Sequence, residues 1–234
     1  MLQANSLTKR YGDHVALQDL NLHVAPGDIY CLLGANGAGK STTINLFLGF
    51  LQPDAGEALI GGQSVQAHPL ETKRQLAYIP ENLSLYPQLS GLENLAYFSG
   101  LAGKTYSQAQ LSDFLTEAGL QGEAHARRVS SYSKGMRQKV GIALALAKQA
   151  RVLLLDEPTS GLDPQASHEF AQLLTRLQSQ GVAVLMATHD LFRAQATGTH
   201  VGILRRGQLV HERTTADTTL DELEALYLET VAVV

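Results

Sequence analysis

The chain has 234 residues, enough for one large core or a core with a smaller lobe, but too few for two full-sized domains. Hydrophobic residues make up 44% of it and charged residues 17%, which is typical of a globular protein and excludes disordered and fibrous classes. The formal net charge of −4 lacks the positive excess that usually accompanies phosphate-backbone binding, so we expect no nucleic-acid partner.

Membrane and redox signals are weak throughout the sequence. No stretch approaches the roughly 18 consecutive apolar residues that cross a bilayer, and the opening MLQANSLTKRYG has no apolar signal-peptide core. We therefore expect a cytoplasmic protein that does not itself form a channel. The single cysteine, Cys31, lies in an apolar run, which favours a small buried hydrophobe over a reactive thiol.

Short apolar runs predict a β-sheet. Several of them are continuous rather than alternating, the pattern of strands that are buried on both faces of a parallel α/β sheet. The sheet should therefore be sandwiched between helices. The predicted strands cover residues 20–24, 29–33, 58–60, 76–79, 152–156, 182–187 and 200–204.

Three helices have the clearest periodic patterns. The first follows Gly39, and its apolar residues recur at helical spacing as far as Leu51. The second begins near Ser133. The third has complete boundary signals, with Asp163 as N-cap, proline at the next position and Gly181 just past its end.

Residues 81–148 interrupt the strand pattern. Apolar residues at helical spacing replace it, notably at 93–101 and 108–118. We interpret this stretch as a helical subdomain inserted into a core that comprises residues 1–80 and 149–212.

The tail, residues 213–234, contains a further helical pattern. Thr219 and Glu222 have the spacing of a capping box, which predicts a short C-terminal helix. No repeats or long linkers divide the chain, so residues 1–234 are predicted to form a single α/β domain.

The strongest motif is GANGAGKS at residues 34–41, a full G-x-x-x-x-G-K-S phosphate loop between a predicted strand and a predicted helix. Its glycines let the backbone N–H groups face phosphates, and the following helix presents its positive end to them. Lys40 would contact the β- and γ-phosphates, and the Ser41 hydroxyl would ligate Mg²⁺. A glycine-rich turn without a ligand is the minor alternative. The candidate nucleotide-binding residues are Gly34, Asn36, Gly37, Ala38, Gly39, Lys40, Ser41 and Thr42.

This motif specifies the fold class more closely. We expect a P-loop NTPase core of the RecA-like type, with a mixed sheet sandwiched by helices and an inserted helical subdomain.

The predicted strand at 152–156 ends in two carboxylates, Asp156 and Glu157. Parallel strands deliver their terminal residues to the crevice where ligands bind. Asp156 suits the outer ligand shell of a metal, and Glu157 suits a general base that polarises the attacking water, a role worth about 10²–10⁴ in rate. A pair of solvated acids would be the better interpretation if this run stood alone.

Three further features narrow the class: YSKGM at residues 132–136, Asp163 shortly after the acids, and His189 at the end of the next predicted strand. With them the sequence resembles the ATP-binding cassette (ABC) family of transporter ATPases over nearly its whole length. The resemblance implies a subunit that binds and hydrolyses ATP with Mg²⁺, dimerises around two ATP molecules and drives a separate transmembrane permease.

Two alternatives remain open. One is an ABC ATPase without a permease, acting as a soluble mechanochemical protein; such proteins usually carry coiled-coil insertions, zinc modules or tandem cassettes, which this sequence lacks. The other is a nucleotide-gated binding module without hydrolysis, against which Glu157 and His189 argue.

YSKGM matches the signature of the family, which is usually LSGGQ. Ser133 and Gly135 match the positions that touch the γ-phosphate of ATP held by the opposite subunit, which implies a head-to-tail dimer, expected to be a homodimer. Ser133 would cap a helix whose N-terminus can receive an anion. Taken alone, YSKGM is better explained as a simple helix N-cap.

The resemblance assigns three more residues. Tyr11 matches the aromatic that stacks on adenine, although a surface tyrosine near a turn is equally plausible. Asp163 matches the loop that links the two active sites, although an N-cap role suffices to explain it. His189 matches the switch histidine that holds the γ-phosphate and the attacking water, although a lone strand-end histidine is more often structural.

Glu81 departs from the family pattern, because most relatives have glutamine there. A carboxylate still ligates Mg²⁺ and accepts from water, but it loses the amide donor and adds negative charge beside the phosphates. The expected metal-binding residues are Ser41, Glu81 and Asp156. Glutamate here, together with YSKGM, resembles the branch that works with ABC-2 type permeases, mostly exporters.

The family resemblance implies a position on the inner face of the cell membrane, peripheral to it, with the permease contacting residues 83–91, although a tyrosine and leucines in that loop can equally be local packing. A narrower similarity, carried by PEN, YPQLSG and YSKGMRQ, connects the sequence with ATPases that serve the maturation of nitrous oxide reductase.

Overall fold

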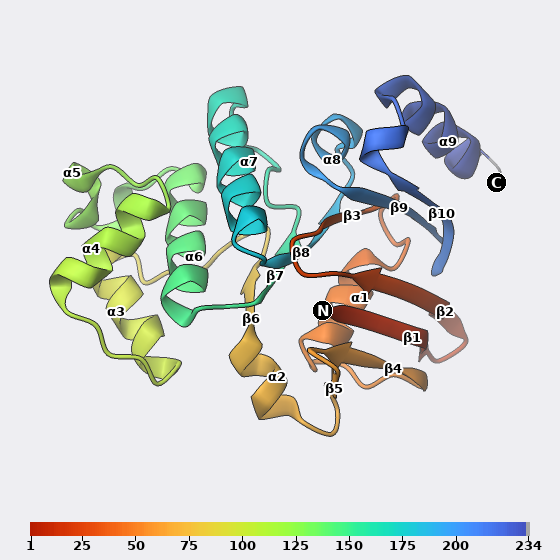
Figure 1. Ribbon diagram of the computed structural model, residues 1–234, viewed down its shortest axis with the longest axis horizontal. Coiled ribbons are helices and arrows are strands. Elements are labelled where there is room, and N and C mark those ends of the chain that lie inside the picture. Colours follow the sequence, from red (N-terminus) through yellow and green to blue (C-terminus); the bar gives the residue numbers. More distant parts are fainter. Residues whose placement is uncertain (233–234) are drawn as a thin grey trace.

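The computed structural model describes residues 1–232, with side chains through residue 230. Two sheets form the core (Figure 1). The first is antiparallel, in the order β2-β1-β4-β5, and the second has six strands in the order β10-β9-β3-β8-β7-β6. The strands are β1 (Leu2–Tyr11), β2 (His14–Val24), β3 (Ile29–Leu33), β4 (Ala55–Ile60), β5 (Gln63–Ser64), β6 (Leu76–Ile79), β7 (Val152–Asp156), β8 (Ala183–Thr188), β9 (His200–Arg205) and β10 (Gln208–Thr214).

The helices connect and cover these sheets. They are α1 (Lys40–Phe47), α2 (Pro69–Gln75), α3 (Gly91–Leu101), α4 (Gln108–Glu117), α5 (Gly122–His125), α6 (Lys134–Lys148), α7 (Pro164–Ser179), α8 (Leu191–Thr197) and α9 (Leu220–Ala232), with 3₁₀ turns at Val129–Ser131 and Thr215–Asp217. None of the helices within residues 1–232 is long and apolar enough to cross a membrane.

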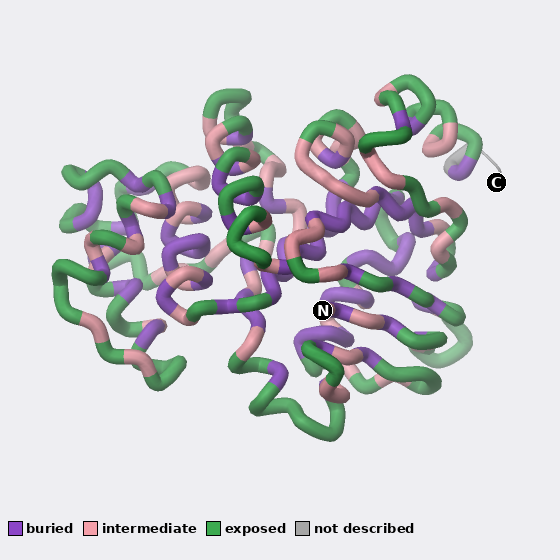
Figure 2. The backbone as a smooth tube through the Cα atoms, in the orientation of Figure 1, coloured by how far each residue is buried: buried purple, intermediate pink, exposed green. Residues whose placement is uncertain are grey.

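The six-stranded sheet is mixed, as the sequence predicts. Strands β9, β3, β8, β7 and β6 run parallel, and β10 pairs antiparallel with β9. Strand β3 is buried along its whole length, and its alternate residues enter two different apolar clusters, one on each face. Figure 2 shows this burial as purple backbone through the central strands. Helices α6, α7 and α8 contribute to one cluster, and the other joins α1 to the antiparallel sheet.

The register of this sheet positions the chemistry. Leu33, the last residue of β3, is the register partner of Thr188 on β8, and Asp156 on β7 is the partner of Ala187. The segments that follow these three strands therefore leave the same edge of the sheet, which is where ligands bind in parallel α/β folds.

Helices α3 to α6 gather beyond the edge strand β6, at the left of Figure 1, whereas α9 packs near β9 at the opposite end. Several predicted boundaries are confirmed by local bonds. Asp163 caps α7 by accepting from the N–H of Ala166, and Thr219 and Glu222 form the reciprocal capping box that precedes α9. Cys31 is buried, and burial raises the pKa of its thiol to about 12, so it stays protonated.

The first helix is shorter than its apolar pattern predicts. It ends at Phe47, because Gly49 adopts the left-handed conformation with φ +68°, and Leu51 lies beyond the helix. Leu51 nevertheless packs against the same apolar cluster, which explains why its spacing suggested a helical face. The sequence pattern also missed β1, β5, β10, α2 and α8.

Candidate active site

A cleft of 460 Å³ lies at the carboxyl edge of the six-stranded sheet. It is bounded by the loop between β3 and α1, the turn between β1 and β2, and the ends of β6 and β7. The predicted site residues that line it are Tyr11, Asn36, Gly37, Gly39, Lys40, Ser41, Thr42, Glu81, Asp156 and Glu157. His14 and Ala16, which the motifs do not indicate, line it as well. The structure thus joins segments that are more than a hundred residues apart.

The phosphate loop is curled tightly against neighbouring backbone. Gly39 caps α1 in the left-handed region, with φ +114°, and a Cβ there would stand 2.7 Å from the carbonyl oxygen of Ala16. A Cβ on Gly34 would stand 2.6 Å from the carbonyl oxygen of Leu204. Only glycine fits these two positions, and the curl aims the N-terminus of α1 at the cleft.

Replacing Gly39 with alanine is therefore expected to destabilise the protein by about 2–5 kcal/mol, because left-handed strain and steric overlap both apply. Gly100, within α3, is a matched control: a Cβ there meets nothing within 4 Å, and Gly100→Ala should stabilise by about 0.5–1 kcal/mol. Thermal or denaturant unfolding measures both changes. An unchanged unfolding midpoint for Gly39→Ala would contradict the conclusion that only glycine fits at this position.

Lys40 is held beneath the loop. Its buried Nζ donates to the carbonyl oxygens of Gly34 at 2.6 Å and Ala35 at 3.3 Å, and lies 3.9 Å from Glu157 Oε1. Burial lowers the pKa of the Lys40 ammonium, while Glu157 and Asp156 act in the opposite direction. An anion at the loop would therefore stabilise the charged form of Lys40.

Two carboxylates and a hydroxyl face the cleft beside Lys40. Ser41 Oγ donates to Asp156 Oδ2 at 3.2 Å, and Ser160 Oγ donates to Glu81 Oε1 at 3.2 Å. Burial raises the pKa of Asp156; the Ser41 hydrogen bond opposes this shift, and the nearby Glu157 carboxylate adds to it. Mg²⁺ in phosphate sites is usually held by one or two carboxylates together with substrate oxygens, so this donor set fits that ion.

Glu157 has a strained backbone conformation, and several contacts hold its backbone and side chain in place. Its φ is +45°, and its N–H donates to the carbonyl oxygen of Ala187 at 2.9 Å. Oε1 lies 2.9 Å from His189 Nδ1, and Oε2 accepts from Thr188 Oγ1 at 3.3 Å. The structure thus brings Glu157 and His189 together. Thr188 is a partner that sequence reasoning missed, although a hydroxyl closing an otherwise apolar strand just before His189 could have indicated it.

Not all the predicted site residues lie in this cleft. Gly34 and Ala38 line a smaller 220 Å³ cavity on another side of the loop, together with Tyr227 of α9. Burial, and secondarily Glu157, raises the pKa of Tyr227.

Ser133, Gly135 and Asp163 lie at the starts of α6 and α7, outside the residues that line the cleft. Ser133 Oγ accepts from the N–H of Met136 at 3.2 Å, which confirms the N-cap. A Cβ on Gly135 would lie 3.3 Å from the Cβ of Ala166, so the two helix starts are adjacent. Together they form a second polar surface, separate from the phosphate loop.

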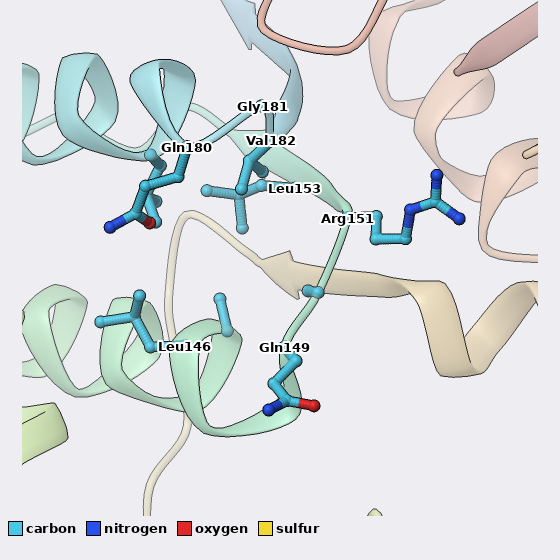
Figure 3. A pocket seen from close by; sticks show the side chains of 10 residues that line it. Leu146, Gln149, Arg151, Leu153, Gln180, Gly181 and Val182 are labelled. Carbon is cyan, nitrogen blue, oxygen red and sulfur yellow. The ribbon is translucent and has the colours of Figure 1, made fainter.

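A third cavity, of 470 Å³, lies between the ends of α6 and α7 and the start of β7 (Figure 3). It contains none of the predicted site residues. In the close-up the side chain of Arg151 points away from Gln149 and Gln180, so the polar groups of this cavity do not converge.

Comparisons with known proteins agree with this geometry. The family profile described as "ABC transporter" matches residues 17–160. The chain is 35% identical over 213 residues to the bacitracin transport ATP-binding protein BcrA of Bacillus licheniformis, covering 91% of this chain and 69% of that protein. It is also 35% identical over 216 residues to the Nod factor export ATP-binding protein I of Cupriavidus metallidurans, covering 91% of this chain and 70% of that protein.

A solved structure resembles it closely as well. The dimeric post-hydrolysis state of the ATP-binding cassette MJ0796, bound to ADP and Pi, superposes with a TM-score of 0.81 at 26% identity, covering 92% of this chain and 99% of that one. Sequence, fold and cleft therefore lead to one conclusion: the chain belongs to the ABC transporter family and is an ATP-binding, ATP-hydrolysing subunit.

Proposed function

We propose that this chain is the ATPase subunit of an exporter, that it dimerises head to tail around two Mg²⁺–ATP, and that it drives a separate ABC-2 type permease. The observation that carries the proposal is the separation of two complementary surfaces. One is the cleft of the phosphate loop and its carboxylates; the other is the pair of capped helix starts at Ser133 and Asp163. The relatives named for bacitracin transport and Nod factor export support the assignment to export.

Within the cleft, the proposed roles follow the contacts. Tyr11 is about half exposed at the rim and would stack on adenine. Lys40 would bind the β- and γ-phosphates, in exchange for its carbonyl contacts. Ser41, Glu81 and Asp156 would hold Mg²⁺, which supplies neutralising charge to the phosphates.

The Glu157 carboxylate would accept a proton from the attacking water. Lys40 Nζ lies 3.9 Å from its Oε1, and the Thr188 hydroxyl donates to its Oε2 at 3.3 Å, so both neighbours help to hold the carboxylate in place. His189 contacts the same carboxylate, yet 60% of its side chain remains exposed. That exposure leaves its ring free to hold the γ-phosphate and the water when a nucleotide is present.

The second subunit would complete each site. The N-terminus of α6, with Ser133 and Gly135, would meet the γ-phosphate of ATP on the opposite chain. Asp163, at the start of α7 beside Gly135, would link the two sites through that interface. A similar cassette has been solved as a dimer, which supports pairing of two subunits, and we propose two identical copies.

The permease would contact residues 83–91. The loop there borders a 360 Å³ pocket, and its Tyr86 makes an edge-on ring contact with Tyr97 of α3 at 5.0 Å. Tyr86, Tyr97 and Leu101 are exposed, which is the composition of a protein-binding patch. We propose that residues 1–80 and 149–212 form the core, that residues 213–234 contain a short tail helix, and that residues 81–148 form a helical subdomain. This subdomain would transmit motion from the core to the permease. The chain would then lie on the inner face of the membrane.

Purification of the full chain from membranes, with identification of the integral protein that accompanies it, tests this function. The co-purified complex should hydrolyse ATP only with Mg²⁺. A Tyr86→Lys variant, purified in the same way as the wild-type chain, should lose the membrane partner while retaining ATP binding. If the wild-type chain hydrolyses ATP but no integral protein accompanies it, the soluble ABC ATPase is the correct alternative.

Glu81→Gln tests the unusual carboxylate. We expect Mg²⁺ to increase ATP affinity less than in the wild type, because one anionic metal ligand is lost. Without metal, ATP should bind more tightly, because a negative charge beside the phosphates is removed. The amide oxygen can still accept from Ser160, so the loop should keep its place. Nucleotide titrations with and without Mg²⁺ measure both effects, and identical curves for the two proteins would remove Glu81 from the site.

A further inference from the structure

Gln138, in the second turn of α6, has an unusual environment. The side chain is 1% exposed, and neither its amide nitrogen nor its amide oxygen has a hydrogen-bond partner among the described residues. The neighbouring Arg137 Nε is also buried without a partner there. A buried amide without partners costs free energy that an apolar side chain of similar length would avoid. A glutamine at this place therefore suggests a second arrangement in which its amide is bonded.

The loop opposite Gln138 offers the partners that it lacks. Gln138 and Glu81 line the same 360 Å³ pocket, together with residues 82–85. Within the described part of the chain, no main-chain hydrogen bond is recorded for residues 82–85. A primary amide has one donor side and one acceptor side, which complement the C=O and N–H of an extended main chain.

The loop also has room to move along α6. Leu83 lines both this pocket and a second cavity of 310 Å³ on its other side. Gly141, one turn after Gln138, lets Leu83 approach closely, because a Cβ there would stand 3.0 Å from Leu83 Cδ2. Leu83 therefore lies close to α6 at Gly141 and borders two cavities.

We propose that Gln138 is a positioning residue for the loop that carries Glu81. When nucleotide and Mg²⁺ occupy the cleft, residues 82–85 close onto α6, and the amide of Gln138 bonds to their main chain and so fixes Glu81 beside the metal. This inference rests on the proposed function, since it requires a loaded cleft.

Hydrogen exchange on the full wild-type chain tests the closure directly. The amides of residues 82–85 should become protected when Mg²⁺ and a non-hydrolysable ATP analogue are added. In Gln138→Met they should stay unprotected, although the analogue still binds. If protection in the wild type does not change on loading, the closure is overturned whatever the variant does.

The same variant separates positioning from packing. Gln138→Met should raise the melting temperature of the nucleotide-free chain by at least about 2 °C, because two unpartnered polar atoms are removed. It should also lower kcat about tenfold with little change in KM for ATP, since the lost contact exists only in the closed state. Gln108→Met, at an exposed glutamine of α4, is the control and should change neither quantity.

Two further results would overturn the proposal. A higher melting temperature with unchanged kcat would show that Gln138 has no role beyond packing. A lower melting temperature would show that its amide is already bonded in the free protein. If the wild-type chain hydrolyses no ATP, or if no membrane partner accompanies it, the proposed function is wrong. The hydrogen exchange of residues 82–85 still tests the loop closure by itself.

Discussion

Replacing Glu157 with glutamine is expected to lower ATP turnover by about 10²–10⁴ while leaving ATP binding in place. The change removes a proton acceptor but keeps the shape of the side chain, so its oxygen can still accept from Thr188. It also removes a negative charge 3.9 Å from Lys40, close to where phosphate would bind. Nucleotide affinity should therefore be equal or higher, and the ATP-bound dimer should accumulate because hydrolysis no longer opens it.

Phosphate release measures turnover for this variant, and size-exclusion chromatography with Mg²⁺ and ATP measures the dimer. Glu123→Gln, at an exposed glutamate of α5, is the matched control and should behave as the wild type. Unchanged turnover in Glu157→Gln would remove that carboxylate from the mechanism. Loss of ATP binding would instead show that it serves the fold of the cleft.

The sequence predicts the cleft well because its residues follow strands that are buried on both faces. Such strands are continuous apolar runs, and parallel strands end at a common edge, so the residues at the ends of the predicted strands 29–33, 152–156 and 182–187 had to meet. The helix boundary at Asp163 was equally predictable from the sequence, because capping depends on residues that are close together in the chain.

The elements that the sequence did not predict depend on distant contacts. Strand β1 carries exposed polar residues, and register shifts with β2 interrupt its alternation between Ala4 and Leu7. Helix α8 has only seven residues, too few to establish a period. The position of Thr188 at the end of an apolar strand could have marked it as a candidate, but its contact with Glu157 depends on the alignment of β7 with β8, which is a tertiary feature.

Mixing two inactive variants is expected to restore ATP hydrolysis if each site is shared between two chains. Lys40→Met damages the phosphate loop, and Ser133→Arg blocks the start of α6, which lies outside the cleft of its own chain. In a mixed dimer, one site collects both lesions, and the other combines the intact loop of one chain with the intact Ser133 surface of its partner. Random exchange in a two-fold dimer makes half the dimers mixed, so about one quarter of wild-type turnover should return.

A chain that carries both lesions is the control for this mixture. Paired with Lys40→Met, it presents the same altered surfaces, yet every phosphate loop is damaged and no site is whole, so no activity should return. Differently tagged chains allow the mixed dimers to be isolated before the assay. If isolated mixed dimers of the two single variants stay inactive, Ser133 does not serve the partner's nucleotide. If Ser133→Arg alone retains full turnover, the start of α6 has only a capping role. The cleft of one chain and the Ser133 surface of the other then do not combine into a shared nucleotide site.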